Sequence, residues 1–163
     1  MDLYLIRHAE ALPLGEAGIT EDDNRPLTPH GEEEAKTVAA GLHRKGITLG
    51  AIVHSPLLRA RQTADAMLRN LPEPAPALEV CEDLAFGGKR RKVSKFINDL
   101  GVDKIALVGH QPDLGQFAAW LIGSKKARID IAKAGVAHIT CDPKAGKGDG
   151  TLVWLVSPDW FEE

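Results

Sequence analysis

The sequence predicts an α/β fold, a three-layer α/β/α sandwich with a mostly parallel central sheet and an antiparallel C-terminal hairpin. Short apolar runs alternate with amphipathic segments up to about residue 122, and this alternation is typical of parallel strands that helices cover on both faces. The last two apolar runs flank a turn-rich loop over residues 142–150, which indicates a hairpin. Because 163 residues suffice for one well-buried core, a single domain over residues 1–163 is expected.

Six strands are expected where apolar runs rich in Ile, Val and Leu lie between turn-forming residues. They are Leu3–Ile6, Ala51–His54, Leu78–Cys81, Lys104–Val108, Val136–Cys141 and Thr151–Val156. The last two are expected to be antiparallel neighbours, because the turn-rich loop joins them directly.

Four helices are expected between these strands. In the first, Thr28 is the N-cap, Pro29 is the first residue, and Gly46 ends an apolar periodicity that continues to that point. The second is expected to begin with Ser55 as its cap and Pro56 as its first residue. The other two cover Lys89 to Leu100 and Pro112 to Ile122.

The charge balance excludes one class of partner. A formal net charge of -3 and a pI near 6.1 do not provide the broad cationic face that non-specific nucleic-acid binding requires, so no nucleic-acid partner is expected. The one basic run, Lys89-Arg90-Arg91-Lys92, is typical of a solvated face at the start of a helix. A docking patch for an acidic partner is the alternative.

Targeting, redox and metal signals are absent from the sequence. No apolar run is long enough to cross a membrane or to form a signal peptide, so we expect a soluble, cytoplasmic protein with no membrane partner. Cys81 and Cys141 form no Cys-x-x-Cys pair, which favours reduced, structural thiols. No His-x-His or Glu-x-x-His spacing occurs, so no metal or other cofactor is expected.

Basic side chains follow three of the predicted strands. Arg7 and His8 come directly after the first strand, Arg59 follows the second by a few residues, and His110 follows the fourth. Open α/β folds bind ligands at the carboxyl edge of their parallel strands. Guanidinium and imidazole groups gathered at that edge indicate phosphate chemistry.

Four sequence blocks carry a resemblance to a known family. The chain resembles the histidine phosphatase superfamily (phosphoglycerate mutase-like), and within it the small SixA-like phosphohistidine phosphatases. The hallmark Arg-His-Gly of that superfamily reads Arg7-His8-Ala9 here. The four blocks occur in the family's order over almost the whole chain: Leu5–Ala11, Arg25–Gly31, Ser55–Ala64 and Val108–Pro112.

The resemblance and the chemistry of the side chains imply the same roles. A neutral His8 imidazole attacks phosphorus with one nitrogen, while the other is held by an acceptor. Arg7 and Arg59 hold the phosphoryl oxygens, and Arg59 gains from a position near a helix N-terminus. His110 is expected to donate to a phosphoryl oxygen, and Arg25 is a further candidate for substrate binding.

The general acid of the family is not evident in this chain. In ester-cleaving relatives and in phosphoglycerate mutases, a glutamate after the third strand protonates the leaving alkoxide, whereas Phe86 stands at the corresponding position here. Glu82, Asp83 and Glu10 are the candidate proton donors. The leaving nitrogen of a phosphoramidate such as phosphohistidine depends less on a strong acid.

These observations predict an enzyme of signal transduction, a phosphatase that hydrolyses phosphohistidine on a partner protein, such as a phosphotransfer domain, through a covalent phosphohistidine intermediate at His8. The intervals in which larger relatives build a lid are short here, and an open groove admits a protein substrate. Two alternatives remain open, a broad small-molecule phosphomonoesterase of the same superfamily and a non-catalytic phosphate-binding regulatory module.

Overall fold

The computed structural model describes residues 1–162, which form one six-stranded sheet with four α-helices. The strands are β1 (Asp2–Arg7), β2 (Ala51–His54), β3 (Ala77–Val80), β4 (Lys104–Gly109), β5 (Val136–Cys141) and β6 (Gly150–Val156). The helices are α1 (Pro29–Arg44), α2 (Leu58–Arg69), α3 (Arg90–Asp99) and α4 (Asp113–Leu121), with short 3₁₀ turns at Asp22–Asn24, Glu82–Leu84 and Pro158–Phe161.

The strand order is β3-β2-β4-β1-β5-β6. β3, β2, β4 and β1 are parallel, while β5 pairs antiparallel with β1 and with β6. The predicted fold class, including the antiparallel C-terminal hairpin, is confirmed. β1 and β4 lie in the middle of the sheet, and each therefore has a hydrogen-bonded neighbour on both sides.

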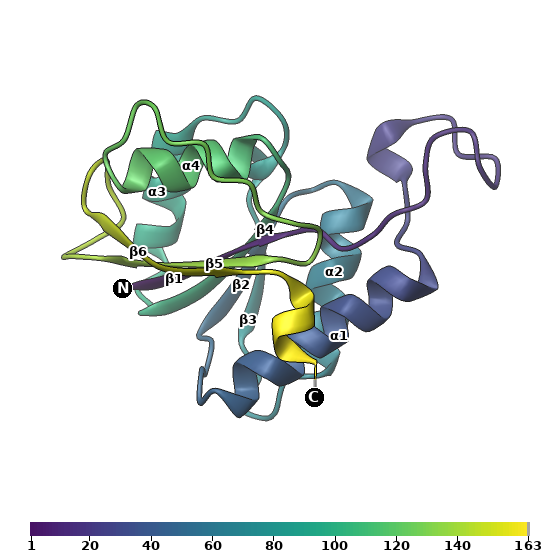
Figure 1. The fold of residues 1–163 in the computed structure, drawn as a ribbon, viewed down its shortest axis with the longest axis horizontal. Helices are drawn as coiled ribbons and strands as arrows, with labels where there is room; N and C mark the ends of the chain where they lie inside the picture. Colours follow the sequence, from purple (N-terminus) through teal and green to yellow (C-terminus); the bar gives the residue numbers. More distant parts are fainter. Residues whose placement is uncertain (163) are drawn as a thin grey trace.

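Helices cover both faces of the sheet (Figure 1), and alternate residues of each central strand face opposite layers. Leu3 and Leu5 of β1 pack in one apolar cluster with residues of α3 and α4. Tyr4 and Ile6 pack in a second cluster with residues of α1 and α2. Central strands buried on both faces explain the continuous apolar runs in the sequence.

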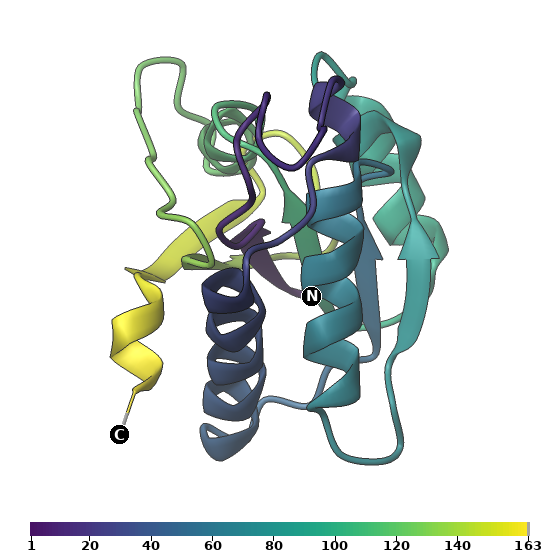
Figure 2. The same cartoon turned by 90° about the vertical axis from the view of Figure 1, so that its right-hand side faces the viewer.

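Helix α1 begins as the sequence predicts. The Thr28 hydroxyl accepts a hydrogen bond from the Gly31 amide, Pro29 is the first helical residue, and Gly46 with φ +73° follows the end of the helix. α1 and α2 lie side by side against the same face of the sheet (Figure 2). This pairing fixes the start of α2 relative to the end of β1.

The predicted start of the second helix is wrong. α2 begins at Leu58, with Leu57 in extended backbone as its N-cap, and Ser55 and Pro56 precede it. The Ser55 hydroxyl accepts from the Leu57 amide at 3.3 Å and contacts His110. The hydroxyl therefore hydrogen-bonds within a local turn and to a distant side chain, and it does not cap the helix. Arg59 is still in the first turn of the helix.

Residues 13–24 form a segment, here called the strap, that leaves the sheet after β1 and projects beyond the helices (dark purple in Figure 1). Its backbone hydrogen bonds are mostly local, such as Gly15 N to Ile19 O at 2.9 Å. Among residues 1–162, the hydrogen bonds from the strap to the helical layers all pass through Asp22, which contacts Arg59 of α2. Between its two ends, the strap is therefore hydrogen-bonded to the helical layers at one residue, Asp22.

Two further expectations concern the thiols and the membrane. Cys81 and Cys141 are buried free thiols, and burial raises the pKa of both, that of Cys141 to about 11. Both thiols are therefore protonated and unreactive at neutral pH. None of the helices in residues 1–162 combines the length and apolarity that a bilayer crossing requires.

Candidate active site

Three neighbouring strands deliver the candidate catalytic side chains to one edge of the sheet. His8 follows β1, His110 follows β4 and Ser55 follows β2, and these strands are adjacent and parallel. The rings of His8 and His110 lie 5.2 Å apart, centroid to centroid. Both histidines and Arg59 are almost fully buried. The structure therefore brings these three predicted residues together.

Two hydrogen bonds fix the tautomer of His8. Its Nδ1 lies 2.7 Å from the carbonyl oxygen of Ala9, which can only accept a proton, so Nδ1 is the donor. Its Nε2 lies 3.3 Å from Nε of Arg59, which can only donate. The His8 ring is thus neutral with a lone pair on Nε2, the state that a nucleophile requires.

Both histidines are held neutral by their surroundings. Burial lowers the pKa of His8 to about 4, against an opposing hydrogen bond to Ala9, and the charges of Arg59, Arg7 and Arg25 lower it further. Burial lowers the pKa of His110 to about 3, with His8, Arg59 and Arg7 acting in the same direction. Neither ring is protonated at neutral pH.

His110 is held by Ser55. Its Nε2 lies 2.8 Å from the Ser55 hydroxyl oxygen. That oxygen already accepts from the Leu57 amide, so its own proton is free to be donated to Nε2. Nδ1 of His110 is buried and has no partner within residues 1–162.

Two arginines surround the histidines. Arg59 is only 2% exposed, which is rare for an arginine unless its charge is compensated. Arg7 donates from Nη1 to the carbonyl oxygen of Ile131 at 3.2 Å, while its Nε is buried and unpartnered within the described residues. Buried donors without partners are uncommon in proteins, and a catalytic role is one explanation for them.

Asp22 of the strap compensates the buried charge of Arg59. Its carboxylate accepts from Nη2 of Arg59 at 3.0 Å and from Nη1 of Arg25 at 3.1 Å, and its backbone oxygen accepts from Nη1 of Arg59 at 2.8 Å. Partial burial raises the pKa of Asp22, but the bonds from both arginines outweigh this and hold that pKa below its ordinary value. A carboxylate therefore occupies the anion-binding face of Arg59.

Sequence reasoning missed Asp22. The residue stands in the acidic run Glu21-Asp22-Asp23, and nothing in the composition or spacing distinguishes it from its neighbours. Arg25, which the sequence singled out, lies beside it and also donates from Nε to the carbonyl oxygen of Leu12 at 2.8 Å. Arg25 thus links the residues on either side of the strap, because it follows the strap and bonds to Leu12, which precedes it. Its contact with the site runs through Asp22.

Thr63 joins Ala9, the residue after His8, to α2. Its hydroxyl donates to the carbonyl oxygen of Arg59 at 2.7 Å and accepts from the Ala9 amide at 3.0 Å. The residue is fully buried. It therefore sets the distance between His8 and Arg59, and this explains why a threonine follows Arg59 by one helical turn.

Phe86 forms one wall of the site. Its ring lies 4.7 Å from the ring of His110, and the guanidinium carbon of Arg59 lies 5.6 Å from its centre. Phe86 remains half exposed, so the wall faces solvent on its other side. An aromatic ring thus contacts two of the predicted catalytic residues, His110 and Arg59.

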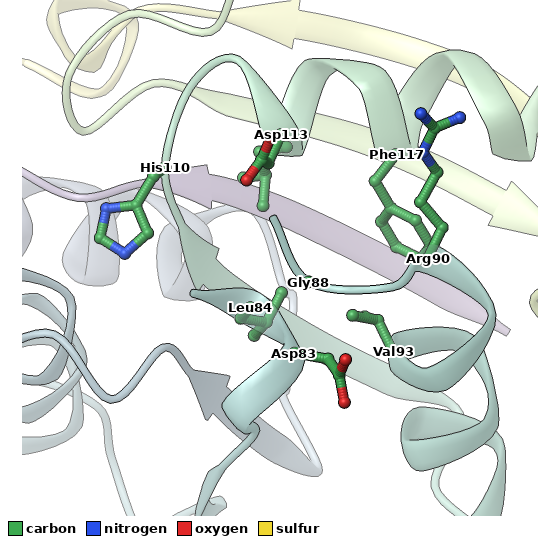
Figure 3. A pocket seen from close by; sticks show the side chains of 9 residues that line it. Asp83, Leu84, Gly88, Arg90, Val93, His110, Asp113 and Phe117 are labelled. Atoms are coloured by element: carbon green, nitrogen blue, oxygen red, sulfur yellow. The ribbon is translucent and has the colours of Figure 1, made fainter. Parts of the chain in front are cut away.

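The three candidate proton donors lie in different surroundings. Asp83 lines a small pocket with His110 (Figure 3), and its carboxylate accepts from the Lys89 amide at 3.1 Å. Glu10 accepts from the Thr28 hydroxyl at 2.7 Å, at the start of α1, and Glu82 is exposed. Within residues 1–162, none of the three hydrogen-bonds to His8 or His110. Asp83 is the one that shares a cavity with a site histidine.

Metal-ligating groups do not cluster in the described part of the chain. Among residues 1–162, no three His, Cys, Asp or Glu side chains converge in a way that could hold a metal ion. The arrangement of the site is instead one uncharged imidazole whose unprotonated Nε2 accepts from Arg59, a second imidazole, and cationic donors. Such a site can bind a phosphoryl group and accept it on nitrogen.

Comparison with known proteins identifies the family to which this chain belongs. The model of the histidine phosphatase superfamily (branch 1) matches residues 3–99, more than half of the chain. The protein belongs to this superfamily, as the sequence motifs indicated.

Three relatives extend the match to nearly the full length. The chain is 36% identical to an uncharacterized protein of Picosynechococcus sp., over 99% of both chains. It is 29% identical to the phosphohistidine phosphatase SixA of Escherichia coli, over 97% of this chain and 94% of that one. The structure of the protein histidine phosphatase SixA complexed with tungstate superposes with a TM-score of 0.84 at 27% identity, covering 99% and 100% of the two chains. These likenesses support a phosphatase.

Proposed function

We propose that the protein hydrolyses phosphohistidine on a partner protein through a covalent phosphohistidine intermediate at His8. The observation that carries the proposal is the arrangement around Nε2 of His8. The nitrogen is uncharged, Arg59 lies beside it, and two buried nitrogens, Nε of Arg7 and Nδ1 of His110, have no partner within residues 1–162. Tungstate, an oxyanion, is bound in the related SixA structure, which supports a phosphoryl site here.

The reaction proceeds in two balanced steps. Nε2 of His8 attacks phosphorus, the bond from phosphorus to the substrate nitrogen breaks, and the leaving imidazole takes up a proton. Water then attacks the phosphorylated His8, the bond from phosphorus to Nε2 breaks, the water gives up a proton, and inorganic phosphate departs. Arg7, Arg59 and His110 donate to the phosphoryl oxygens in both transition states.

Asp22 must give way before the phosphoryl group binds. The carboxylate and an incoming phosphoryl group both need the Nη donors of Arg59. The strap is attached to the helical layers through Asp22, so it is free to move once this pair separates. Arg59 then exchanges one anion for another and is paired before and during the reaction.

The absence of a glutamate at residue 86 supports a phosphoramidate as substrate. An alkoxide leaving group needs a proton in the transition state, and general acid catalysis contributes about 100-fold to 10,000-fold to such reactions. The imidazole of phosphohistidine needs less help, because its bridging nitrogen is protonated by solvent or by a modest donor such as Asp83. The site is also open beside the exposed ring of Phe86, which suits a substrate carried on a protein surface.

A turnover comparison at one enzyme concentration tests this function. A phosphohistidine peptide, phosphoramidate and an alkyl phosphate are the substrates, and His8→Ala is the control that shows turnover belongs to this site. We expect kcat/KM to be at least about 100-fold higher for the first two substrates than for the alkyl phosphate. Preference for the alkyl phosphate would show that the protein is a phosphomonoesterase instead. Phosphate binding without any turnover would show that it is a regulatory module.

A gain-of-function variant tests whether the missing acid makes the protein prefer phosphoramidates over phosphomonoesters. Phe86→Glu places a carboxyl group where ester-cleaving relatives have theirs, and Phe86→Gln is the matched variant without an acid. We expect Phe86→Glu alone to raise the ratio of alkyl phosphate to phosphoramidate turnover, by about tenfold or more. Equal ratios in the two variants would mean that the missing acid does not set substrate preference.

A further inference from the structure

A basic groove lies beside the candidate active site. It has a volume of about 420 Å³. Its basic lining residues are Arg90, Lys125 and Lys147, and Gln116 and Trp120 of α4 also line it. We propose that this groove binds an acidic segment of the phosphohistidine-bearing partner, next to the phosphorylated residue. The inference rests on the proposed function and names a property of its substrate.

The groove and the small pocket that His110 lines share a wall. Arg90 lines both the groove and the small pocket that contains His110, and it lies across that pocket from His110 in Figure 3. Neighbouring faces of α4 line the two, with Asp113 and Phe117 in the pocket and Gln116 and Trp120 in the groove. A helix of nine residues extends about 13 Å at 1.5 Å per residue. A partner segment of similar length would follow α4 from the phosphohistidine into the groove.

The cations of the groove are available for a partner. Arg90, Lys125 and Lys147 are exposed, and none of them forms a salt bridge within residues 1–162. Lys126 and Arg128, in the same loop as Lys125, are exposed as well. The net charge of the whole chain is -3, so this cationic region is local and stands out against an acidic molecule. Such a region favours acidic partners and speeds their encounter.

The backbone holds two of the cations in place. The Gly148 amide donates to the Trp120 carbonyl oxygen at 3.1 Å, which attaches the loop between β5 and β6 to the end of α4. Gly123 and Gly148 approach each other so closely that a Cβ on Gly123 would lie 3.2 Å from the Cα of Gly148. Lys147 and Lys125 therefore lie on two loops that are packed together. The groove is formed before any partner binds.

The distribution of charge favours a protein over a nucleic acid. Asp83 and Asp113 lie in the pocket at the His110 end, whereas the cations lie further along α4. A nucleic acid carries a phosphate at every step and would place some of them against these aspartates. A protein segment can place its carboxylates opposite the cations alone, and the partner is therefore expected to be acidic on one side of its phosphohistidine.

Two synthetic peptides test the proposal. Both carry one phosphohistidine, and glutamates flank it in the first where glutamines flank it in the second. We expect kcat/KM to be about tenfold higher for the acidic peptide at low salt, and the advantage to shrink at high salt because exposed charges are screened. In the double variant Lys125→Glu/Lys147→Glu, the preference for the acidic peptide should disappear while turnover of phosphoramidate stays unchanged.

The matched control reverses the same number of charges elsewhere. Lys36→Glu/Arg69→Glu alters exposed side chains on α1 and α2 and should leave the peptide preference intact. Equal hydrolysis of both peptides by the unaltered protein would overturn the docking proposal and leave the proposed function standing. If a single-stranded oligonucleotide then inhibited the reaction, the groove would belong to a nucleic acid. Failure to hydrolyse either peptide would overturn the proposed function and the docking proposal together.

Discussion

At the scale of single residues, His8 is ready to react because of where it lies. The Ala9 carbonyl and the Arg59 guanidinium bond to opposite ring nitrogens, and burial beside cations lowers the pKa of the ring to about 4. No general base is needed to free the lone pair of Nε2. His110 differs, because one of its nitrogens contacts Ser55 and the other has no partner within residues 1–162.

Substitutions at the site should have graded effects. His8→Ala should abolish turnover, because the proposed covalent intermediate forms on that side chain. Arg59→Ala and His110→Ala should leave weak activity, since one lost donor to a transition-state oxygen costs about 3 to 4 kcal/mol. Steady-state kinetics with phosphoramidate measure this order, and near-normal rates in His8→Ala would refute the covalent mechanism.

At the scale of elements, the strap and α2 share one ion pair between Asp22 and Arg59, which are 40% and 2% exposed in their side chains. The Asp22 carboxylate therefore competes with any other anion for Arg59. A carboxylate already on Arg59 lowers the affinity of the site for any free oxyanion, because binding then includes the cost of separating the pair.

Neutralising the strap carboxylate should therefore tighten anion binding. In Asp22→Asn, the inhibition constant for inorganic phosphate should fall about three-fold to ten-fold, the partly exposed pair being worth about 1 kcal/mol. Asp23→Asn removes the neighbouring charge, which is exposed and makes no bond to Arg59, and serves as the control. An unchanged inhibition constant in Asp22→Asn would show that the pair does not oppose anion binding.

The elements also show what the sequence can and cannot predict. Strands, helices and the Thr28 cap follow from local periodicity and local hydrogen bonding, and the positions of His8, Arg59 and His110 follow from the strands that precede them. The local pattern at Ser55 predicts a helix cap, whereas its hydroxyl contacts a histidine 55 residues away. Asp22 meets Arg59 across 37 residues. Such pairings depend on how the chain closes in space, and no local pattern encodes them.

At the scale of the whole molecule, two of the buried histidines, His8 and His110, link stability to pH. In the unfolded chain each has the ordinary pKa of 6.5, and in the folded protein the values are about 4 for His8 and about 3 for His110. Between these values the unfolded state binds more protons than the folded state, so stability falls as pH falls.

The expected loss begins near pH 6.5 and amounts to about 1.4 kcal/mol per pH unit for each histidine. It continues to about pH 4 for His8 and to about pH 3 for His110. Urea unfolding between pH 7 and pH 5 measures the free energy of unfolding, and the double variant His8→Gln/His110→Gln should lose most of the slope. The same slope in both proteins would mean that other groups cause it.

Activity should not depend on a metal ion. The proposed steps use only imidazole nitrogens, arginine donors and water, so turnover of phosphoramidate should survive exhaustive treatment with a chelator. The rate before and after chelation, followed by addition of single divalent ions, tests this. Loss of activity that one of these ions restores would contradict the proposed mechanism.

The strand order has a consequence for amide hydrogen exchange. β1 and β4, which precede His8 and His110, each pair with strands on both sides, so their amides should exchange only when the whole domain unfolds. The strap is attached through Asp22 and should exchange orders of magnitude faster. The strands that hold the two histidines would then belong to the last part of the molecule to open, while the segment that pairs with Arg59 would belong to the first. Substrate could enter repeatedly without the catalytic geometry ever being disturbed.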